Sequence, residues 1–215
     1  MPGILFAHME PPAEIEDEFN RWYDEDHVPS RLGVPGFRAA HRYRQVGRDR
    51  PAYTVVYELD DPGVVQTPEY KEMQARTAPA TDAMISRLHR FYRAIAGEIS
   101  VAGDDLGPVG HDYLYVVAFP VPDEDVEQFD AWYDTEHVPL LLRAEGWRRC
   151  RRYTVTESNG TFTRLALHDL DDPSVLDSPE RAEAGGTPWR TYLTRKPWFG
   201  KNERWVYERI RTATA

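Results

Sequence analysis

The sequence predicts an α+β protein made of two ferredoxin-like repeats, each with the element order β-α-β-β-α-β. Two observations carry this prediction. The run WYDEDHVP, residues 22–29, returns as WYDTEHVP, residues 132–139, with six of eight residues unchanged. The run LDDP then follows in both copies, at residues 59–62 and 170–173. A repeat on this scale indicates that one supersecondary unit is present twice, and it sets the order in which the elements are assigned.

Apolar runs and turn residues place the elements of the first repeat. GILFAHM is short and rich in strand-forming residues, so it predicts a buried strand. Prolines and acids then open an amphipathic helix with Ile15, Phe19 and Trp22 on its apolar face. Val28 and Pro29 are expected to end this helix, because the residue before a proline favours an extended backbone. We expect strands at 3–9, 36–46, 52–59 and 89–99, and helices at 11–27 and 66–89, the second interrupted near Pro79.

The second repeat has the same order. YLYVVAF predicts a buried strand, and Val126, Phe129 and Trp132 give the next helix its apolar stripe. Asn159-Gly160 predicts a hairpin turn, because both residues accept positive φ. The same residues match a glycosylation sequon, which is the weaker interpretation. We expect strands at 113–119, 146–157, 162–170 and 202–210, and helices at 122–137 and 178–194, the second interrupted near Pro188.

The repeats define the expected domain organisation. Residues 1–100 form the first ferredoxin-like repeat, 101–112 a Gly- and Pro-containing linker, and 113–215 the second repeat. Strand sequences such as AYTVVYEL put apolar groups on both faces of a sheet, so the face without helices must also be covered. We therefore expect the two repeats to pack sheet to sheet, or to curl into one barrel-like body, and to act as a single structural domain.

Composition argues against several function classes. The chain has 215 residues and a net charge of −10, and its 36 acidic side chains outnumber 26 basic ones, which disfavours a nucleic-acid partner. No apolar run approaches a membrane span and no secretory signal precedes the first strand, so we expect a cytoplasmic protein. The single cysteine, Cys150, excludes an internal disulfide. The basic run RRCRR, residues 148–152, is interpreted as a solvated or carboxylate-paired strand face, with anion recognition as the alternative.

The repeated motif also carries a resemblance to a known family. Each copy has the run W-Y-x-x-x-H-x-P and then a glycine followed by an aromatic residue. Pro35 precedes that glycine in the first copy, whereas Ala144-Glu145 takes this place in the second. With this pattern the chain resembles the dimeric α+β barrel superfamily, and within it the EthD-like group, as a tandem repeat in one chain. The residues concerned are Trp22, Tyr23, His27, Pro29, Gly36, Phe37, Trp132, Tyr133, His137, Pro139, Gly146 and Trp147.

The resemblance covers nearly the whole chain and is more specific for fold than for activity. It implies a pseudo-dimeric α+β barrel with a pocket between sheet and helices in each half. Relatives include cofactor-free isomerases, dehydrochlorinases, oxygenases and lyases that act on small, often aromatic or lactone-like molecules, haem enzymes, and members without a settled activity. Fold alone therefore gives no warrant for one reaction.

The repeated histidines are the predicted catalytic residues. Asp24 and His27 are three residues apart, as are Asp134 and His137, so each pair shares one face of an α-helix. A carboxylate beside an imidazole raises its pKa and holds one tautomer, which suits a general acid or base near neutral pH. The alternative is that each histidine only stabilises the end of its helix.

Further residues are candidates for substrate binding. Two strand histidines are asymmetric between the repeats, since His8 corresponds to Ala118 and His168 to Tyr57, which suggests that the two pockets are not equivalent. Structural roles are the alternative for these histidines. Two repeated arginines are candidates for reading a substrate carboxylate or enolate, with a cross-strand salt bridge as the alternative. The full set is Tyr23, Tyr133, Trp22, Trp132, His8, His168, Arg42 and Arg152.

The leading functional hypothesis is a cofactor-independent lyase, isomerase or dehydratase that uses histidine acid/base chemistry on a small aromatic, polyketide-like or lactone metabolite. A non-catalytic small-molecule-binding or accessory protein is the second hypothesis, and a haem enzyme with His8 or His168 as axial ligand is the third. No metal site is expected, because two ligands per pocket are few. Nucleotide-binding and serine-hydrolase motifs are absent. The expected partners are a small-molecule substrate and a second copy in a homodimer, without nucleic acid or membrane.

Overall fold

The computed structural model describes residues 1–48, 50–105, 107 and 111–215. Its helices and strands fall into two compact units. Unit 1 contains Met1–Gly97, Thr156–Gly160 and Tyr207–Ala215, and unit 2 contains Glu98–Val155 and Thr161–Val206.

Three strands contribute residues to both units, and one of them is β6 (Trp147–Ser158). The other two are β4 (Arg90–Gly103) and β8 (Glu203–Thr214). The predicted boundary near residue 100 therefore falls inside a strand, and residues 101–103 of the predicted linker continue that strand. Residues 106 and 108–110 of the linker lie outside the described residues.

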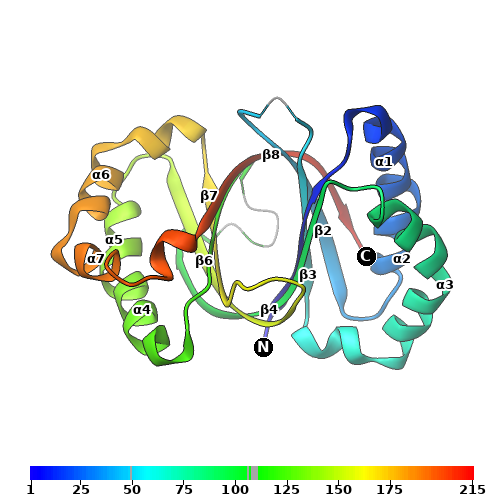
Figure 1. Ribbon diagram of the computed structural model, residues 1–215, viewed down its shortest axis with the longest axis horizontal. Helices are drawn as coiled ribbons and strands as arrows, with labels where there is room; N and C mark the ends of the chain where they lie inside the picture. Colours follow the sequence, from blue (N-terminus) through cyan, green and yellow to red (C-terminus); the bar gives the residue numbers. More distant parts are fainter. Residues whose placement is uncertain (49, 106, 108–110) are drawn as a thin grey trace. The chain divides into compact units, whose positions relative to one another are not determined.

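The sheet of unit 1 is antiparallel, with the hydrogen-bonded order β4-β1-β3-β2-β8. Three helices lie along one face of this sheet (Figure 1), so its other face is free of helices within the unit. The new elements are strands β1 (Gly3–Glu10), β2 (Phe37–Gln45) and β3 (Tyr53–Leu59) and helices α1 (Glu16–Trp22), α2 (Val28–Leu32) and α3 (Pro68–Ile85).

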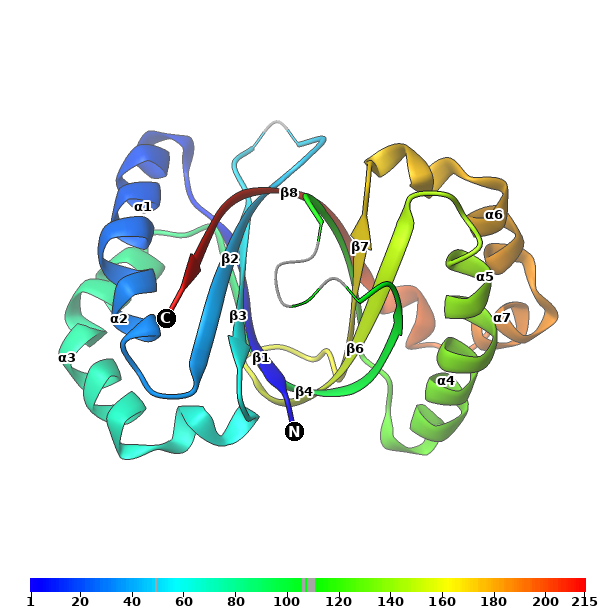
Figure 2. The same cartoon turned by 180° about the vertical axis from the view of Figure 1, so that it is seen from behind.

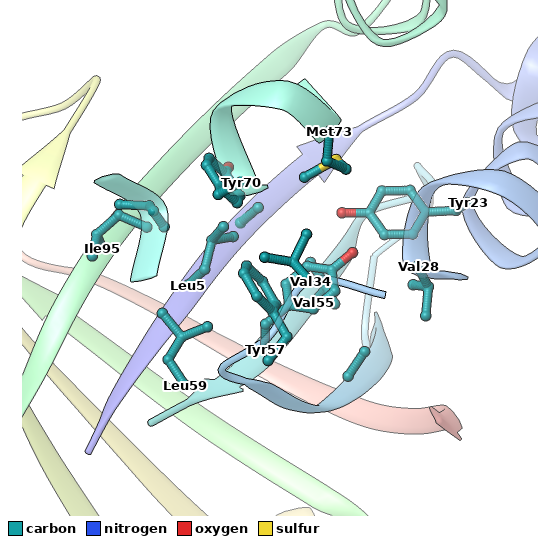
Figure 3. Packing of buried hydrophobic residues seen from close by; sticks show 14 of the residues in the cluster. Leu5, Tyr23, Val28, Val34, Val55, Tyr57, Leu59, Tyr70, Met73 and Ile95 are labelled. Atoms are coloured by element: carbon teal, nitrogen blue, oxygen red, sulfur yellow. The ribbon is translucent and has the colours of Figure 1, made fainter. Parts of the chain in front are cut away.

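Alternation along the strands builds the core of unit 1. Successive side chains of a strand point to opposite faces, so Leu5, Val55 and Tyr57 all face the helices. Tyr23 and Val28 meet them from the helical side (Figure 3). Full burial of side chains of this size contributes about 1.5–3 kcal/mol each. This packing fixes the helical segment that carries His27 against the sheet.

Unit 2 repeats this arrangement with a different second helix. Its sheet has the order β8-β5-β7-β6-β4, and α4 to α7 lie along one face (Figure 2). The new elements are strands β5 (Tyr113–Phe119), β6 (Trp147–Ser158) and β7 (Arg164–Leu170) and helices α4 (Val126–Trp132), α5 (Val138–Leu141), α6 (Pro179–Gly186) and α7 (Pro188–Leu193). The predicted α+β class, with the order β-α-β-β-α-β present twice, is confirmed.

The repeated motif forms a π-helical turn in each unit, at Tyr23–His27 and at Tyr133–His137. The N–H of Val28 donates to the carbonyl of Tyr23, five residues back, so the turn is one residue wider than an α-helical turn. The prediction that Val28 and Pro29 end the helix is wrong, because the helix continues to Leu32. Pro29 lies in the first turn of α2, where its missing N–H is tolerated.

The two predicted proline interruptions have different outcomes. Pro188 does interrupt its helix, since α6 ends at Gly186 and Thr187 caps a new helix by accepting from the N–H of Arg190. The interruption predicted at Pro79 is wrong, because α3 runs through it from Pro68 to Ile85. Met73 and Met84 are buried on either side of Pro79, and this packing holds the helix together.

No helix in the described parts of the chain is both long and apolar enough to span a membrane.

Candidate functional site

Each unit contains a pocket between its helices and its sheet, and the histidine of the repeated motif lines each one. The pocket of unit 1 has a volume of about 470 Å³. Strand side chains such as Leu5 and Met9 line one wall, and α3 supplies much of the opposite wall. The polar groups that reach it include His27, Arg31 and Tyr70.

The π-helical turn places His27 among aromatic rings. Its ring centroid lies 4.4 Å from that of Trp22 and 4.6 Å from that of Tyr23. Residues five apart come one above the other in a π-helix, whereas in an α-helix they point in different directions. The wider turn therefore makes the contact between Trp22 and His27 possible.

His27 is neutral at physiological pH. Burial holds the pKa of its imidazole well below the usual 6.5, and the charges of Arg31 and Arg42 lower this pKa further. A neutral imidazole offers one nitrogen as a hydrogen-bond acceptor and the other as a donor. We expected the carboxylate of Asp24 to raise the pKa of His27, but this environment lowers it.

Arg31 is a buried cation, with 8% of its surface exposed. Its Nη1 donates to the backbone carbonyl of His27 at 3.3 Å. Among the described residues it has no carboxylate partner, although an isolated buried charge is costly. Leu141 occupies the equivalent position in unit 2, so the fold does not require a cation there. Sequence reasoning missed Arg31, and its contrast with Leu141 is the signal that would have found it.

The pocket of unit 2 is smaller, at about 290 Å³, and three arginines and two histidines line it. The ring of His137 stacks on Trp132, with centroids 4.5 Å apart and planes 28° apart. Burial and the charges of Arg190, Arg204 and Arg181 lower the pKa of His137 to about 3, although a backbone hydrogen bond with Ala184 opposes them. Its Nδ1 is buried and has no hydrogen-bond partner in the described part of the chain. This imidazole is also neutral.

His168 lines the same pocket and has a defined tautomer. Trp147 Nε1, which can only donate, lies 3.1 Å from His168 Nδ1, and Tyr133 Oη lies 3.1 Å from His168 Nε2. Burial holds the pKa of His168 well below its usual value, so the ring is neutral. Its Nε2 therefore carries the proton and donates to the Tyr133 oxygen, which leaves the Tyr133 hydroxyl hydrogen free to point elsewhere.

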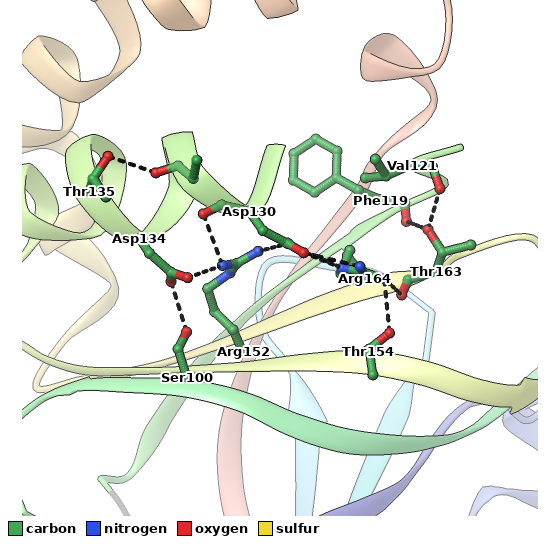
Figure 4. Close-up of polar contacts among 11 residues, drawn as sticks. Ser100, Phe119, Val121, Asp130, Asp134, Thr135, Arg152, Thr154, Thr163 and Arg164 are labelled. Atoms are coloured by element: carbon green, nitrogen blue, oxygen red, sulfur yellow. Dashed lines mark hydrogen bonds and ion pairs between the residues drawn. The ribbon is translucent and has the colours of Figure 1, made fainter. Parts of the chain in front are cut away.

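The aspartates of the motif pair with arginines and not with the histidines. Asp24 accepts from Arg42 and also pairs with Arg211 at 3.2 Å. Asp134 pairs with Arg152 at 2.8 Å and accepts from Ser100 at 2.8 Å (Figure 4). The predicted Asp-His pairing assumed an α-helix, in which residues three apart share a face. The π-helical turn changes that spacing and directs the aspartates toward the sheet.

Arg42 and Arg152 lie on strands, form salt bridges with the aspartates of the helical motif, and lie over aromatic rings. Each guanidinium carbon is 4.6 Å from the centroid of the motif tyrosine, Tyr23 or Tyr133. Arg152 also pairs with Asp130. Neither arginine lines its unit's pocket. Other arginines of RRCRR pair with carboxylates as well, which agrees with the interpretation of this run as a carboxylate-paired strand: Arg148 with Asp171 and Arg149 with Asp169.

His8 lies on the opposite face of the unit 1 sheet from His27. Its neighbours Ala7 and Met9 line the pocket, so alternation directs His8 away from it. His8 Nδ1 contacts Tyr207 Oη at 2.7 Å, and His8 Nε2 contacts Glu10 Oε1 at 3.1 Å. Burial lowers its pKa, although the hydrogen bond to Glu10 opposes this.

The strand histidines do not fit haem ligation. Both ring nitrogens of His8 and of His168 are within hydrogen-bond distance of other side chains, so neither ring offers a free nitrogen to iron. Among the residues that the structure describes, no group of three or more His, Cys, Asp or Glu side chains could hold a metal ion.

Comparison with known proteins supports the fold. No family model and no curated protein matches the sequence. An anthrone oxidase-like protein has a similar structure, with a TM-score of 0.71 and 14% identity over 100% of this chain and 93% of that one. A candidate monooxygenase from Fusobacterium nucleatum has a TM-score of 0.59 and 12% identity, over 99% of this chain and 94% of that one. A candidate chlorite dismutase has a TM-score of 0.58 and 16% identity, over 98% of this chain and 96% of that one. At these identities the likeness shows the fold alone, that of ferredoxin-like α+β barrel proteins.

Proposed function

We propose that this protein is an enzyme that moves a proton on a small aromatic or polyketide-like molecule bound in the pocket of unit 1, with His27 as the base. One observation carries the proposal: a neutral imidazole and a buried cation without a carboxylate partner, His27 and Arg31, line the same pocket. A base and a site for the resulting anion are the two groups that proton abstraction needs.

The proposed first step is written as a proton transfer. An imidazole nitrogen of His27 takes a proton from an acidic C–H or O–H group, which gives imidazolium and a substrate anion. The substrate anion lies against Arg31, so the imidazolium of His27 and the guanidinium of Arg31 both face its negative charge. Return of the proton to another carbon completes an isomerisation, and loss of a group from the carbon next to the carbanion completes an elimination. No cofactor is needed for either outcome.

The aromatic wall supports a flat, apolar substrate. Phe19, Trp22 and Phe91 line the pocket together with Leu88 and Ile85. Pockets for small molecules are commonly lined in this way, with few polar groups that fix orientation. The EthD-like assignment, the origin of the chain as a tandem repeat, and a role for Asp24 in supporting the site through Arg42 belong to this proposal.

A second candidate is oxidation of the same anion by molecular oxygen. The similar structure described as anthrone oxidase-like favours it. The substrate carbanion and O2, with one proton, would give a hydroperoxide, and loss of water from it would give a ketone. The first step and its residues are unchanged, so the two candidates differ only in the fate of the anion.

Hydrogen exchange tests the shared step without knowledge of the product. Anthrone, a 1,3-diketone and an unsaturated lactone are each incubated with the protein in D2O under argon, and deuterium uptake at the acidic carbon is followed by NMR. We expect His27→Gln to lower the catalysed rate about 100-fold or more. His89→Gln, the same change at an exposed histidine of unit 1, serves as the control.

The outcomes separate the hypotheses. Full exchange in His27→Gln would remove His27 as the base. Oxygen uptake once air is admitted would favour oxidation over isomerisation. Binding without exchange for every compound would favour the non-catalytic binding or accessory protein. A cytoplasmic location and a homodimer are also proposed, and size-exclusion chromatography with light scattering tests the homodimer.

A further inference from the structure

Three arginines from three elements converge on the pocket of unit 2. They are Arg181 of α6, Arg190 of α7 and Arg204 of β8. Of the described residues that line this pocket, none is acidic. The chain as a whole has a net charge of −10, so this concentration of positive charge is local.

These arginines lack the carboxylate partners that their neighbours have. Arg190 Nη1 donates to the backbone carbonyl of Gly185 at 2.6 Å, and its guanidinium lies 5.7 Å from the Phe199 ring centroid. Across the described residues, no ion pair involves Arg181, Arg190 or Arg204. By contrast, Arg143 pairs with Glu183 on the exposed side of the same region.

The three charges repel one another, and their effect is visible at two groups. Burial lowers the pKa of Arg190, and the charges of Arg204 and Arg181 lower it further. The same three arginines act together with burial on His137. An anion in the pocket would relieve this repulsion and accept charge-assisted hydrogen bonds.

Local sequence places two of these side chains. Ser178 caps α6 by accepting from the N–H of Arg181, and Thr187 caps α7 by accepting from the N–H of Arg190. The pattern is S/T-P-x-R in both, at residues 178–181 and 187–190. Each cap therefore fixes an arginine at the third position of its helix. In unit 1 the residue equivalent to Arg181 is Tyr70, so the basic pocket is not a requirement of the fold.

We propose that the pocket of unit 2 binds a small carboxylic acid with a flat apolar body. The arginines would hold the carboxylate. Trp132, Trp147 and Phe199 would contact the apolar body, because they line the rest of the same pocket. A bare inorganic anion leaves these walls uncovered, and the volume of about 290 Å³ favours a one- or two-ring compound over a larger one. This inference does not depend on the proposed activity of unit 1.

Isothermal titration of the full chain with 2-naphthoate, 2-naphthamide and inorganic phosphate tests the inference. We expect naphthoate to bind at least tenfold more tightly than the neutral amide or phosphate. Arg181→Met, Arg190→Met and Arg204→Met should each weaken naphthoate binding about tenfold. Arg143→Met, outside the pocket, is the matched control.

The result that overturns the inference is equal binding of naphthoate and naphthamide, or naphthoate affinity that survives the triple methionine variant. Phosphate binding as tight as naphthoate binding would also overturn it, because the apolar walls would then have no role. The three variants remove mutual repulsion, so we expect their melting temperatures to be no lower than that of the wild type, and circular dichroism checks this. Arg31→Leu should leave naphthoate binding unchanged, which separates this site from the pocket of unit 1.

Discussion

The two pockets start from the same motif and differ in where positive charge lies. In unit 1 a buried guanidinium, Arg31, lies next to the motif histidine in a cavity of about 470 Å³, and the other arginine that lines this cavity, Arg93, is paired with Glu157. In unit 2 that position is Leu141, and the arginines come from the second half of the repeat into a cavity of about 290 Å³. One backbone plan therefore supports two different electrostatic environments, and the residues outside the motif decide which one forms.

Substitutions that exchange Arg31 and Leu141 between the two units give the largest expected change in the free energy of unfolding. Leu141→Arg places a fourth cation in the basic pocket, and we expect a loss of about 3–5 kcal/mol in the free energy of unfolding, because the new charge is buried without a partner. Arg31→Leu should leave stability unchanged or slightly raised while it slows catalysed exchange about 100-fold. Urea unfolding and the exchange assay measure the two effects. Equal stability losses for both variants would show that the pockets are electrostatically alike.

The strand arginines give the next effect. Arg152→Met leaves Asp134 without an arginine partner and removes the cation from the face of Tyr133, so we expect a loss of about 3 kcal/mol. Arg42→Met should cost less, about 2 kcal/mol, because Asp24 keeps Arg211. Chemical denaturation ranks the two variants, and the reverse order would contradict the assignment of partners.

The wild type should lose more stability in acid than a variant without His137. Its folded pKa of about 3 is below the unfolded value of 6.5, so the unfolded state binds the proton first and stability falls as pH decreases through this interval. Between pH 7 and pH 5 this histidine alone should account for about 2 kcal/mol of lost stability. Unfolding curves at both pH values should show a correspondingly smaller loss in His137→Gln. An unchanged loss would mean that His137 titrates normally in the fold.

The prolines give the smallest effect, with opposite signs in the two units. Pro79 lies inside α3 and cannot donate to a helical carbonyl, so Pro79→Ala should stabilise the protein by about 1 kcal/mol. Pro188 is at the first position of α7, where proline is favoured, so Pro188→Ala should be neutral or slightly destabilising. Thermal melts distinguish the two, and a loss of stability in Pro79→Ala would show that the proline supports the helix.

The fold was largely predictable, because strand alternation and the internal repeat are properties of the sequence alone. YLYVVAF forms β5 at the predicted residues. The π-helical turn was not predictable. No residue type in WYDEDHVP makes a backbone N–H bond the carbonyl five residues back in preference to the carbonyl four residues back. That turn is also why Asp24 pairs with Arg42 and not with His27.

The site was predictable only where the repeat itself marks it. His27 and His137 do line pockets, but Arg31, Arg181, Arg190 and Arg204 were missed. All four arginines lie outside the run of residues that the two repeats share. Three of them come from α6, α7 and β8, which follow that run far along the chain. Whether an arginine has a carboxylate partner depends on distances between elements that one sequence does not reveal.

The π-helical turn makes the motif sensitive to length. A deletion of one residue between Tyr23 and His27 would restore α-helical hydrogen bonding, in which four residues turn the chain about as far as five residues do in the π-helical turn, so His27 would keep its direction. The same deletion would move Pro29 from the first turn of α2 into the interior of one continuous helix, where it blocks a hydrogen bond. Substitutions in the motif change one side chain, whereas a change in its length would alter the hydrogen bonding of the whole helical segment.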